Sequence, residues 1–242
     1  MTEKLSDRER QISEGMKRVF EKIEEAKHRS VSKRDVTVMG ATKTVPAELI
    51  RYAHGIGLEA AGENRVNELC EKYEIGAYEG MRLDFIGRLQ TNKVKYIVGK
   101  VDMIQSLDSL GLCAEIEKRY AAADKICNAL IELNSGEEAA KGGVMPADAM
   151  SFADETDAFP HIRLCGVMTV APFCEKKEDY KRFFEKTYKV FIDISTKKLH
   201  NINEPVLSMG MSDNYDVAVE CGATLIRPGS AIFGKRPGNL QI

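Results

Sequence analysis

The pattern of apolar and polar positions divides the chain into an opening helix and a long series of alternating segments. Near the N-terminus, apolar residues recur at helical spacing with charged residues between them, which predicts a helix over residues 4–30. The predicted buried face consists of Ile12, Met16, Val19, Phe20 and Ile23. Ser6-Asp7-Arg8-Glu9 offers a capping box near its start.

After this helix, short apolar or β-branched runs alternate with longer amphipathic stretches, which is typical of βα units around a parallel sheet. The predicted strands cover residues 36–41, 58–61, 83–86, 103–105, 127–133, 162–168, 205–208 and 224–226. The predicted helices cover residues 47–55, 64–73, 92–98, 109–122, 146–157, 178–199 and 213–220, with a Gly- and Ala-rich loop over residues 136–145. Eight such units behind an extra helix predict an α/β fold, a single TIM-type (β/α)8 barrel domain over residues 1–242. A doubly wound open sheet is the alternative that this pattern leaves open.

Composition narrows the class of protein. The chain has 242 residues, of which 43% are hydrophobic and 30% charged, with a net charge of −2 that creates no field for nucleic acid or an anionic membrane. It has no apolar run of the roughly 18 residues that a membrane helix needs, and its charged N-terminus does not resemble a signal peptide. The six cysteines are scattered, with no CxxC pair and no histidine placed to complete a zinc site. We therefore expect a cytoplasmic protein with reduced cysteines, no metal and no nucleic-acid or membrane partner.

A lysine closes the first predicted strand, in the segment Ala41-Thr42-Lys43-Thr44. In a barrel, the residues that carry chemistry gather where strands end and βα loops begin. Lysine is rarely buried without a partner, and desolvation leaves its amine nucleophilic. Lys43 is therefore a candidate Schiff-base lysine, although a lysine that extends to the surface is the plainer interpretation of this one position.

The last two predicted strands end in segments rich in glycine and serine, Ser208-Met209-Gly210-Met211-Ser212 and Arg227-Pro228-Gly229-Ser230. Glycine lets the backbone approach a ligand closely, and hydroxyl and N–H groups at helix starts bind phosphate. Phosphate sites in barrels often follow strands seven and eight. Together with Lys43, these segments predict a phosphorylated aldehyde as ligand, and a sugar phosphate fits the same pattern.

Further motifs follow one another in a recognisable order. They are Gly62-Glu63-Asn64, Phe85-Ile86-Gly87-x-Leu89-Gln90-x-Asn92-Lys93, Asn134…Glu138…Lys141, Gly166-Val167-Met168, Ser208-Met209-Gly210-Met211-Ser212 followed by Asp213, and Arg227-x-Gly229-x-Ala231-Ile232-Phe233-Gly234. On these motifs the chain resembles the YggS/PROSC family of pyridoxal phosphate homeostasis proteins. The resemblance runs through most of the chain and implies a fold type III barrel for pyridoxal 5'-phosphate (PLP), similar to the N-terminal domain of alanine racemase.

The resemblance also implies roles for individual residues. Lys43 would carry PLP as an internal aldimine, Asn64 would lie beside the cofactor ring, and Arg227 would face the pyridine nitrogen. Ser208 would grip the phosphate together with the backbone near Gly229 and Ser230.

Three positions depart from the family pattern. Arg88 stands where histidine is common and Arg65 where tyrosine is common, so the roles of those two side chains do not carry over. Pro228 replaces an aliphatic residue and removes one backbone N–H beside the phosphate segment.

The function that the resemblance implies is intracellular vitamin B6 homeostasis, with PLP-dependent apo-enzymes as recipients of the cofactor. Related racemases use a second base from a separate C-terminal domain, whereas this chain ends at Ile242, soon after the last predicted strand. No other residue is an evident second base. We therefore predict a monomeric carrier without catalytic residues. The alternatives are a slow PLP-dependent racemase or lyase, and a sugar-phosphate enzyme in which Lys43 attacks a substrate carbonyl.

Overall fold

Eight parallel strands form a closed barrel in the computed structural model, which describes residues 2–138, 142–199 and 202–234. Each strand pairs with the next in chain order, and β8 pairs with β1 through Thr37↔Leu225 and Val38↔Ile226. The predicted barrel is confirmed, and closure excludes an open sheet. The strands are β1 Thr37–Ala41, β2 Ala60–Glu63, β3 Arg82–Phe85, β4 Met103–Leu107, β5 Cys127–Leu133, β6 Ile162–Thr169, β7 Val206–Ser208 and β8 Leu225–Ile226.

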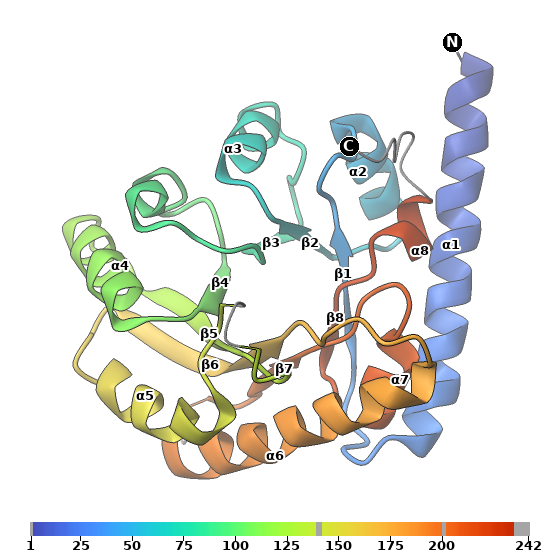
Figure 1. The fold of residues 1–242 in the computed structure, drawn as a ribbon. Coiled ribbons are helices and arrows are strands. Elements are labelled where there is room, and N and C mark those ends of the chain that lie inside the picture. Colours follow the sequence, from blue (N-terminus) through green and yellow to red (C-terminus); the bar gives the residue numbers. More distant parts are fainter. Residues whose placement is uncertain (1, 139–141, 200–201, 235–242) are drawn as a thin grey trace.

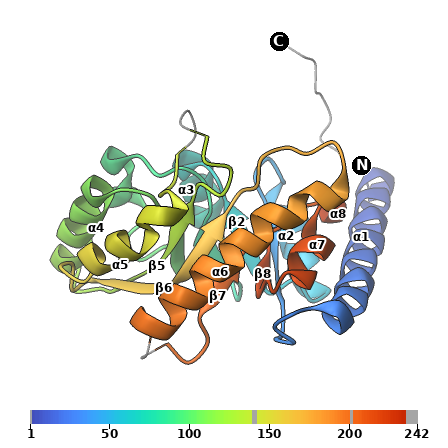
Figure 2. The same ribbon diagram turned by 60° about the horizontal axis from the view of Figure 1, so that its bottom comes forward.

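Helices surround the strands on the outside of the barrel (Figures 1 and 2). The α-helices are α1 Thr2–Arg29, α2 Ala47–Gly55, α3 Val66–Glu74, α4 Leu110–Ala122, α5 Ala149–Thr156, α6 Tyr180–Lys198, α7 Tyr215–Glu220 and α8 Ser230–Phe233. The 3-10 helices are η1 Thr91–Tyr96, η2 Pro146–Asp148 and η3 Lys177–Asp179. The helix predicted over residues 92–98 is therefore a 3-10 helix, and the helices predicted over 146–157 and 178–199 each begin with a 3-10 turn. The short helix α8 was not predicted, because four residues carry no readable period.

Helix α1 packs along one side of the barrel, against α7 and α8 (Figure 1). Its buried stripe contains Ile12, Met16, Val19 and Ile23, as expected, and continues to Ala26. Phe20 was wrongly placed on that stripe, since it is 41% exposed. The capping box was also wrong, because the helix begins at Thr2 and Ser6 lies inside it.

The barrel interior is divided between apolar and polar side chains. One apolar cluster joins Met39, Ala60 and Leu225, and another joins Met103, Leu130, Cys165 and Met168. Fully buried Asp84, Gln105 and Ser208 lie at interior positions of β3, β4 and β7. A larger core fills the space between strands and helices. Polar groups inside a barrel require partners, and these partners define the site described below.

All six cysteines are free thiols. In the ranges that the structure describes, no helix is both long and apolar enough to cross a membrane. In the loop after β5, Val144 forms a bridge with Leu133, whereas Lys141 lies outside the described residues.

Candidate functional site

Lys43 lies in the turn between β1 and α2, where the sequence predicted it. The strand ends at Ala41, and Thr44 adopts a left-handed conformation with φ of +63° before the chain enters α2. Lys43 is half-buried and lines a cavity of about 240 Å³. Arg227, Gly229 and Ser230 line the same cavity. The structure thus brings together four of the six residues predicted to bind the cofactor.

Two backbone donors converge at the start of α8. The N–H groups of Gly229 and Ala231 both donate to the hydroxyl oxygen of Ser212, over 3.0 and 3.1 Å. Both acceptor positions of the Ser212 hydroxyl are thus used by backbone donors, so this side chain would contact a ligand through its hydroxyl hydrogen. Ser212 also lines the cavity with Lys43, although it was not among the predicted site residues. Its signal in the sequence was the second serine of the Ser-Met-Gly-Met-Ser motif.

Pro228 does not disturb this arrangement. Its carbonyl accepts the N–H of Ala41 over 2.9 Å, so the residue ties the segment after β8 to the end of β1. The N–H groups that converge on Ser212 belong to the residues after Pro228 and are therefore retained.

Ser208, expected beside Gly229 and Ser230, lies apart from them inside the barrel. It is 0% exposed and does not line the cavity with Lys43. Its hydroxyl donates to Gln105 Oε1 over 2.6 Å and accepts a hydrogen bond from Nη1 of Arg227. Ser208 therefore contacts the side chain of Arg227 rather than the Gly229 turn.

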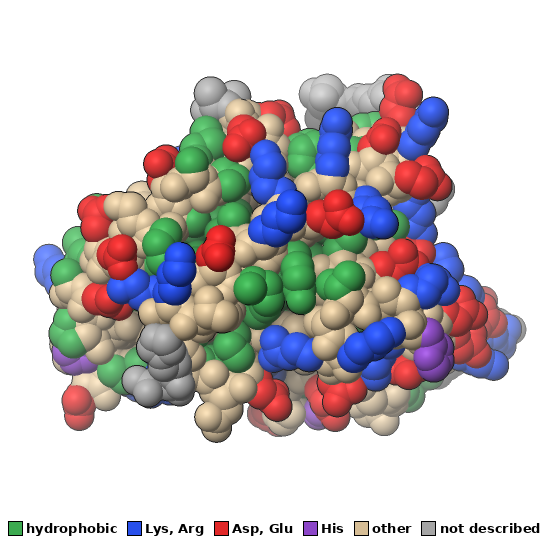
Figure 3. All heavy atoms as spheres, turned by 90° about the horizontal axis from the view of Figure 1, so that it is seen from below, with side chains coloured by type: hydrophobic (Ala, Val, Ile, Leu, Met, Phe, Trp, Pro, Cys, Tyr) green, Lys and Arg blue, Asp and Glu red, His purple; other side chains and the backbone are tan. Residues whose placement is uncertain are grey.

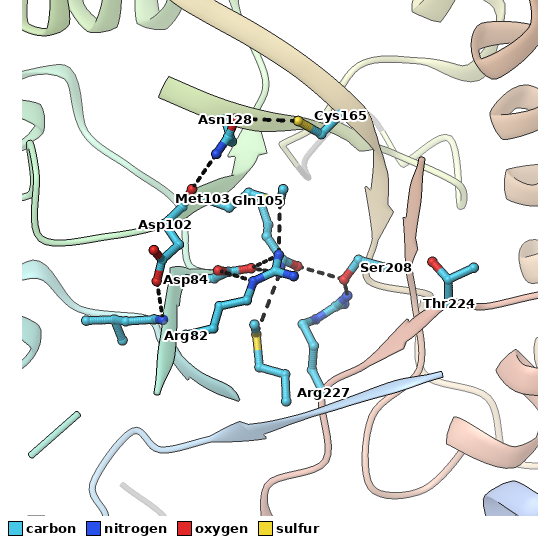
Figure 4. Close-up of polar contacts among 12 residues, drawn as sticks. Arg82, Asp84, Asp102, Met103, Gln105, Asn128, Cys165, Ser208, Thr224 and Arg227 are labelled. Carbon is cyan, nitrogen blue, oxygen red and sulfur yellow. Dashed lines mark hydrogen bonds and ion pairs between the residues drawn. The ribbon is translucent and has the colours of Figure 1, made fainter. Parts of the chain in front are cut away.

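A chain of hydrogen bonds continues from Ser208 across the barrel interior (Figure 4). Gln105 donates through Nε2 to Asp84 Oδ2 over 2.7 Å, and Arg82 donates to both oxygens of Asp84 over 2.9 and 2.8 Å. Arginine can only donate, and a carboxylate can only accept. With an arginine at each end, the direction of every bond in the chain is therefore determined, including the orientation of the Gln105 amide.

Among the residues of this hydrogen-bond network, Arg227 is the one that lines the cavity at Lys43. It is 3% exposed, and its second guanidinium nitrogen, Nη2, donates to the carbonyl of Thr169 over 2.8 Å. Burial lowers the pKa of Arg227 to about 10, while the nearby Glu132 opposes this shift. The guanidinium is still protonated at neutral pH, so Arg227 presents a fixed, donor-only cation to the cavity.

Asn64 lies beside a second, larger cavity. It follows β2 and lines a space of about 1370 Å³ that shares Thr44, Val45 and Pro46 with the cavity at Lys43. Its Oδ1 is buried and has no hydrogen-bond partner in the parts of the chain that the structure describes. Gly87 allows this packing, because a Cβ there would lie 2.3 Å from the carbonyl oxygen of Asn64. Arg65 and Arg88 line this larger cavity from exposed positions.

Comparison with known proteins agrees with this geometry. The family model described as alanine racemase, N-terminal domain, matches residues 9–237, which places the chain in the class of PLP-type barrels. A pyridoxal phosphate homeostasis protein of Aquifex aeolicus is 41% identical over 92% of this chain and 97% of its own length. The chain therefore belongs to the family of pyridoxal phosphate homeostasis proteins.

Solved structures give the same result. A protein of unknown function from Bifidobacterium adolescentis is 30% identical, with a TM-score of 0.85 over 93% of this chain and 96% of that one. PipY of Synechococcus elongatus, solved with PLP bound, is 26% identical, with a TM-score of 0.74 over 82% of this chain and 92% of its own.

Proposed function

We propose that this protein binds PLP in the cavity at Lys43 and serves intracellular vitamin B6 homeostasis. The observation that carries the proposal is the cavity itself, which places a lysine amine in the same space as a buried arginine and the Gly229–Ser230 turn. The family to which the chain belongs and the PLP bound to PipY support it. We further propose that residues 1–242 form one domain.

The residues present fit PLP at three points. The Gly229 turn with Ser212 and Ser230 suits the phosphate, Arg227 suits the pyridine nitrogen, and Lys43 suits the aldehyde. The unpartnered Oδ1 of Asn64 belongs to the adjoining larger cavity, where it is an acceptor that a ligand donor would satisfy. When bound, PLP supplies an aldehyde conjugated to an electron-withdrawing ring. Because the Arg227 guanidinium can only donate hydrogen bonds, it would pair with an unprotonated pyridine nitrogen, and a neutral ring is a weaker electron sink.

An absorption spectrum tests this proposal most directly. The purified protein should bind PLP stoichiometrically and develop a visible absorption band from the bond between Lys43 and the aldehyde carbon. A colourless protein that gains no band from added PLP would contradict the proposal and favour a sugar-phosphate enzyme on the same barrel.

We also propose that the protein has no catalytic residues and acts as a carrier or regulator. The Aquifex aeolicus relative, named as a homeostasis protein, supports this role. PLP-dependent apo-enzymes are the proposed recipients, and the protein is proposed to be a cytoplasmic monomer that binds neither nucleic acid nor membranes. On the face seen in Figure 3, basic and acidic side chains are interspersed, so the described residues form no continuous basic patch there.

The two serines of the Ser-Met-Gly-Met-Ser motif should have separable effects on binding. We expect Ser212→Ala to weaken PLP binding roughly tenfold, because a hydrogen bond to a charged phosphate contributes about 1.5–3 kcal/mol. Binding of pyridoxal, which lacks the phosphate, should not change. Ser208→Ala should weaken both ligands, since we propose that Ser208 acts through Arg227 at the ring. Titrations of both ligands measure this, with the exposed Ser151→Ala as a matched control.

If Ser208→Ala weakens PLP and leaves pyridoxal unaffected, then Ser208 contacts the phosphate after all, as the sequence analysis expected. An unchanged PLP affinity in Ser212→Ala would contradict the proposed phosphate end.

The carrier role predicts little exchange of amino-acid protons. Racemisation needs proton removal on one face of the cofactor and return on the other, and Lys43 serves one face. Loss of α-deuterium from labelled alanine and serine should therefore be far slower than roughly 1 s⁻¹, an ordinary enzymatic rate. Mass spectrometry over several hours, against Lys43→Ala, measures it. Exchange at 1 s⁻¹ or faster would identify a PLP-dependent racemase or lyase instead.

A further inference from the structure

The turn that carries Lys43 is held by hydrogen bonds on both sides of that residue. The hydroxyl of Thr42 donates to Glu63 Oε1 over 2.8 Å, and the carbonyl of Thr42 accepts a hydrogen bond from Lys72 Nζ over 2.8 Å. On the other side, the N–H of Thr44 donates to Glu68 Oε1. We call Glu63, Glu68 and Lys72 the turn clamp. Its members lie on β2 and α3, and Glu68 and Lys72 line the larger cavity, which shares Thr44 with the cavity at Lys43.

Lys72 is saturated with acceptors. Its ammonium group has three donors, and it contacts Thr42 O, Glu63 Oε1 at 2.8 Å and Glu68 Oε1 at 2.7 Å. Because each of its three donors has an acceptor, the Lys72 side chain is held at the turn. Lys72 therefore serves as a structural cation at this turn.

The two carboxylates of the turn clamp are held by different partners. Glu63 is 0% exposed and accepts a further hydrogen bond from the hydroxyl of Tyr78 over 2.8 Å. Although burial acts to raise the pKa of Glu68, hydrogen bonds from Lys72 and Thr44 lower it below its ordinary value. A carboxylate that keeps its charge is a strong acceptor for the Thr44 N–H.

The backbone at Thr44 explains why the turn needs these contacts. A φ of +63° is an uncommon conformation for a β-branched residue and costs roughly 1–3 kcal/mol unless the surroundings stabilise it. The contact from Glu68 stabilises that residue, directly after Lys43. The hydrogen bonds of the turn clamp are not part of the backbone ladder between strands. Losing them should therefore change the direction of the Lys43 side chain more than the closure of the barrel.

We propose that Glu63, Glu68 and Lys72 are positioning residues that direct the amine of Lys43 at the aldehyde of PLP. The inference rests on the proposed function. Nζ of Lys43 adds to the aldehyde carbon, and the aldehyde oxygen leaves as water with two protons from the amine. A displacement of 1 Å between reacting groups can slow a reaction about 100-fold, so a loosened turn slows bond formation without weakening the phosphate end.

The test separates binding from bond formation. Glu68→Ala removes the acceptor of the Thr44 N–H and leaves the pair between Lys72 and Glu63 in place. Binding is measured with deoxypyridoxine phosphate, an analogue that has a methyl group instead of the aldehyde. Bond formation is measured by stopped-flow absorbance after PLP is added. We expect Glu68→Ala to slow the visible band at least tenfold and to change the analogue affinity less than twofold.

Three further variants make the test specific. Glu68→Gln keeps an oxygen acceptor for Thr44 and should restore most of the rate. Thr42→Val removes one hydroxyl without changing any charge, and should slow the band even if Glu68→Ala fails to fold. Lys100→Met breaks the 2.7 Å pair with Glu74 at the far end of α3 and should leave both measurements unchanged.

The outcomes are distinguishable. If Glu68→Ala and Thr42→Val form the band at the wild-type rate, or weaken the analogue and PLP equally, the turn clamp has no positioning role. If the wild-type chain binds the analogue and never forms the band with PLP, the proposed function itself is contradicted.

Discussion

Replacing Lys43 with alanine is expected to abolish the visible band of the PLP-loaded protein completely. The amine of Lys43 lines the cavity in which we propose that the aldehyde binds, whereas Lys72 lies outside that cavity with all three of its donors hydrogen-bonded. PLP can still bind at the Gly229 turn, so the variant should retain a colourless or differently coloured cofactor with reduced affinity.

Two measurements check this expectation. The absorption spectrum reports the band, and mass spectrometry after borohydride reduction reports the covalent adduct on the tryptic peptide that contains residue 43. The exposed Lys22→Ala serves as the control and should keep both signals. A Lys43→Ala variant that still yields the band and an adduct would assign the bond to another lysine.

The fold should survive the loss of Lys43. Its side chain is half-buried in a cavity rather than packed in the core, so we expect the free energy of unfolding to change by about 0.5 kcal/mol or less. Urea denaturation followed by circular dichroism measures this change, and a loss of several kcal/mol would show that the lysine is structural.

The largest effect on stability is expected from Gly166→Ala. Gly166 has a φ of +149°, and a Cβ at this position would lie 1.9 Å from the carbonyl oxygen of Val206 on the neighbouring strand β7. Since both atoms belong to adjacent strands of a closed barrel, the overlap cannot be relieved by rotating a side chain. We expect the variant to lose more than about 4 kcal/mol of unfolding free energy or to be insoluble.

Gly111→Ala provides the matched control. Gly111 lies in α4, and a Cβ there would meet no atom within 4 Å. Alanine should stabilise this helix by about 0.5–1 kcal/mol. Thermal and urea denaturation of both variants give the comparison. Equal stabilities would show that the approach between β6 and β7 is loose enough to accept a methyl group.

Local patterns were sufficient to predict most of the elements. The strand Cys127–Leu133 and the helix Ala47–Gly55 have the predicted bounds, because a long apolar run and a strong helical period leave little ambiguity. Strand β2 instead extends through Glu63, two residues beyond the apolar run. Its last side chain, Glu63, is buried through contacts with Thr42 after β1, Lys72 on α3 and Tyr78 after α3.

The residues of the candidate site likewise divide into those whose place the sequence predicts and those whose place depends on tertiary packing. Lys43 and the Gly229–Ser230 turn were predictable, since a barrel brings the ends of its strands to one face whatever the details of packing. The partners of Ser208 were not. Its hydroxyl meets Gln105, 103 residues away, because the register of β7 against β6 and β8 turns Ser208 into the barrel and leaves Ser212 beside the Gly229–Ser230 turn.

By itself, then, the sequence determined the alternation of strands and helices, the position of the lysine and the family to which the chain belongs. Those properties follow from residue type and spacing along the chain. The tertiary structure decided which serine reaches Arg227, which residues clamp the Lys43 turn and how closely Val206 approaches Gly166. Each of these depends on contacts between strands or helices distant in sequence, whose register is set when the barrel closes.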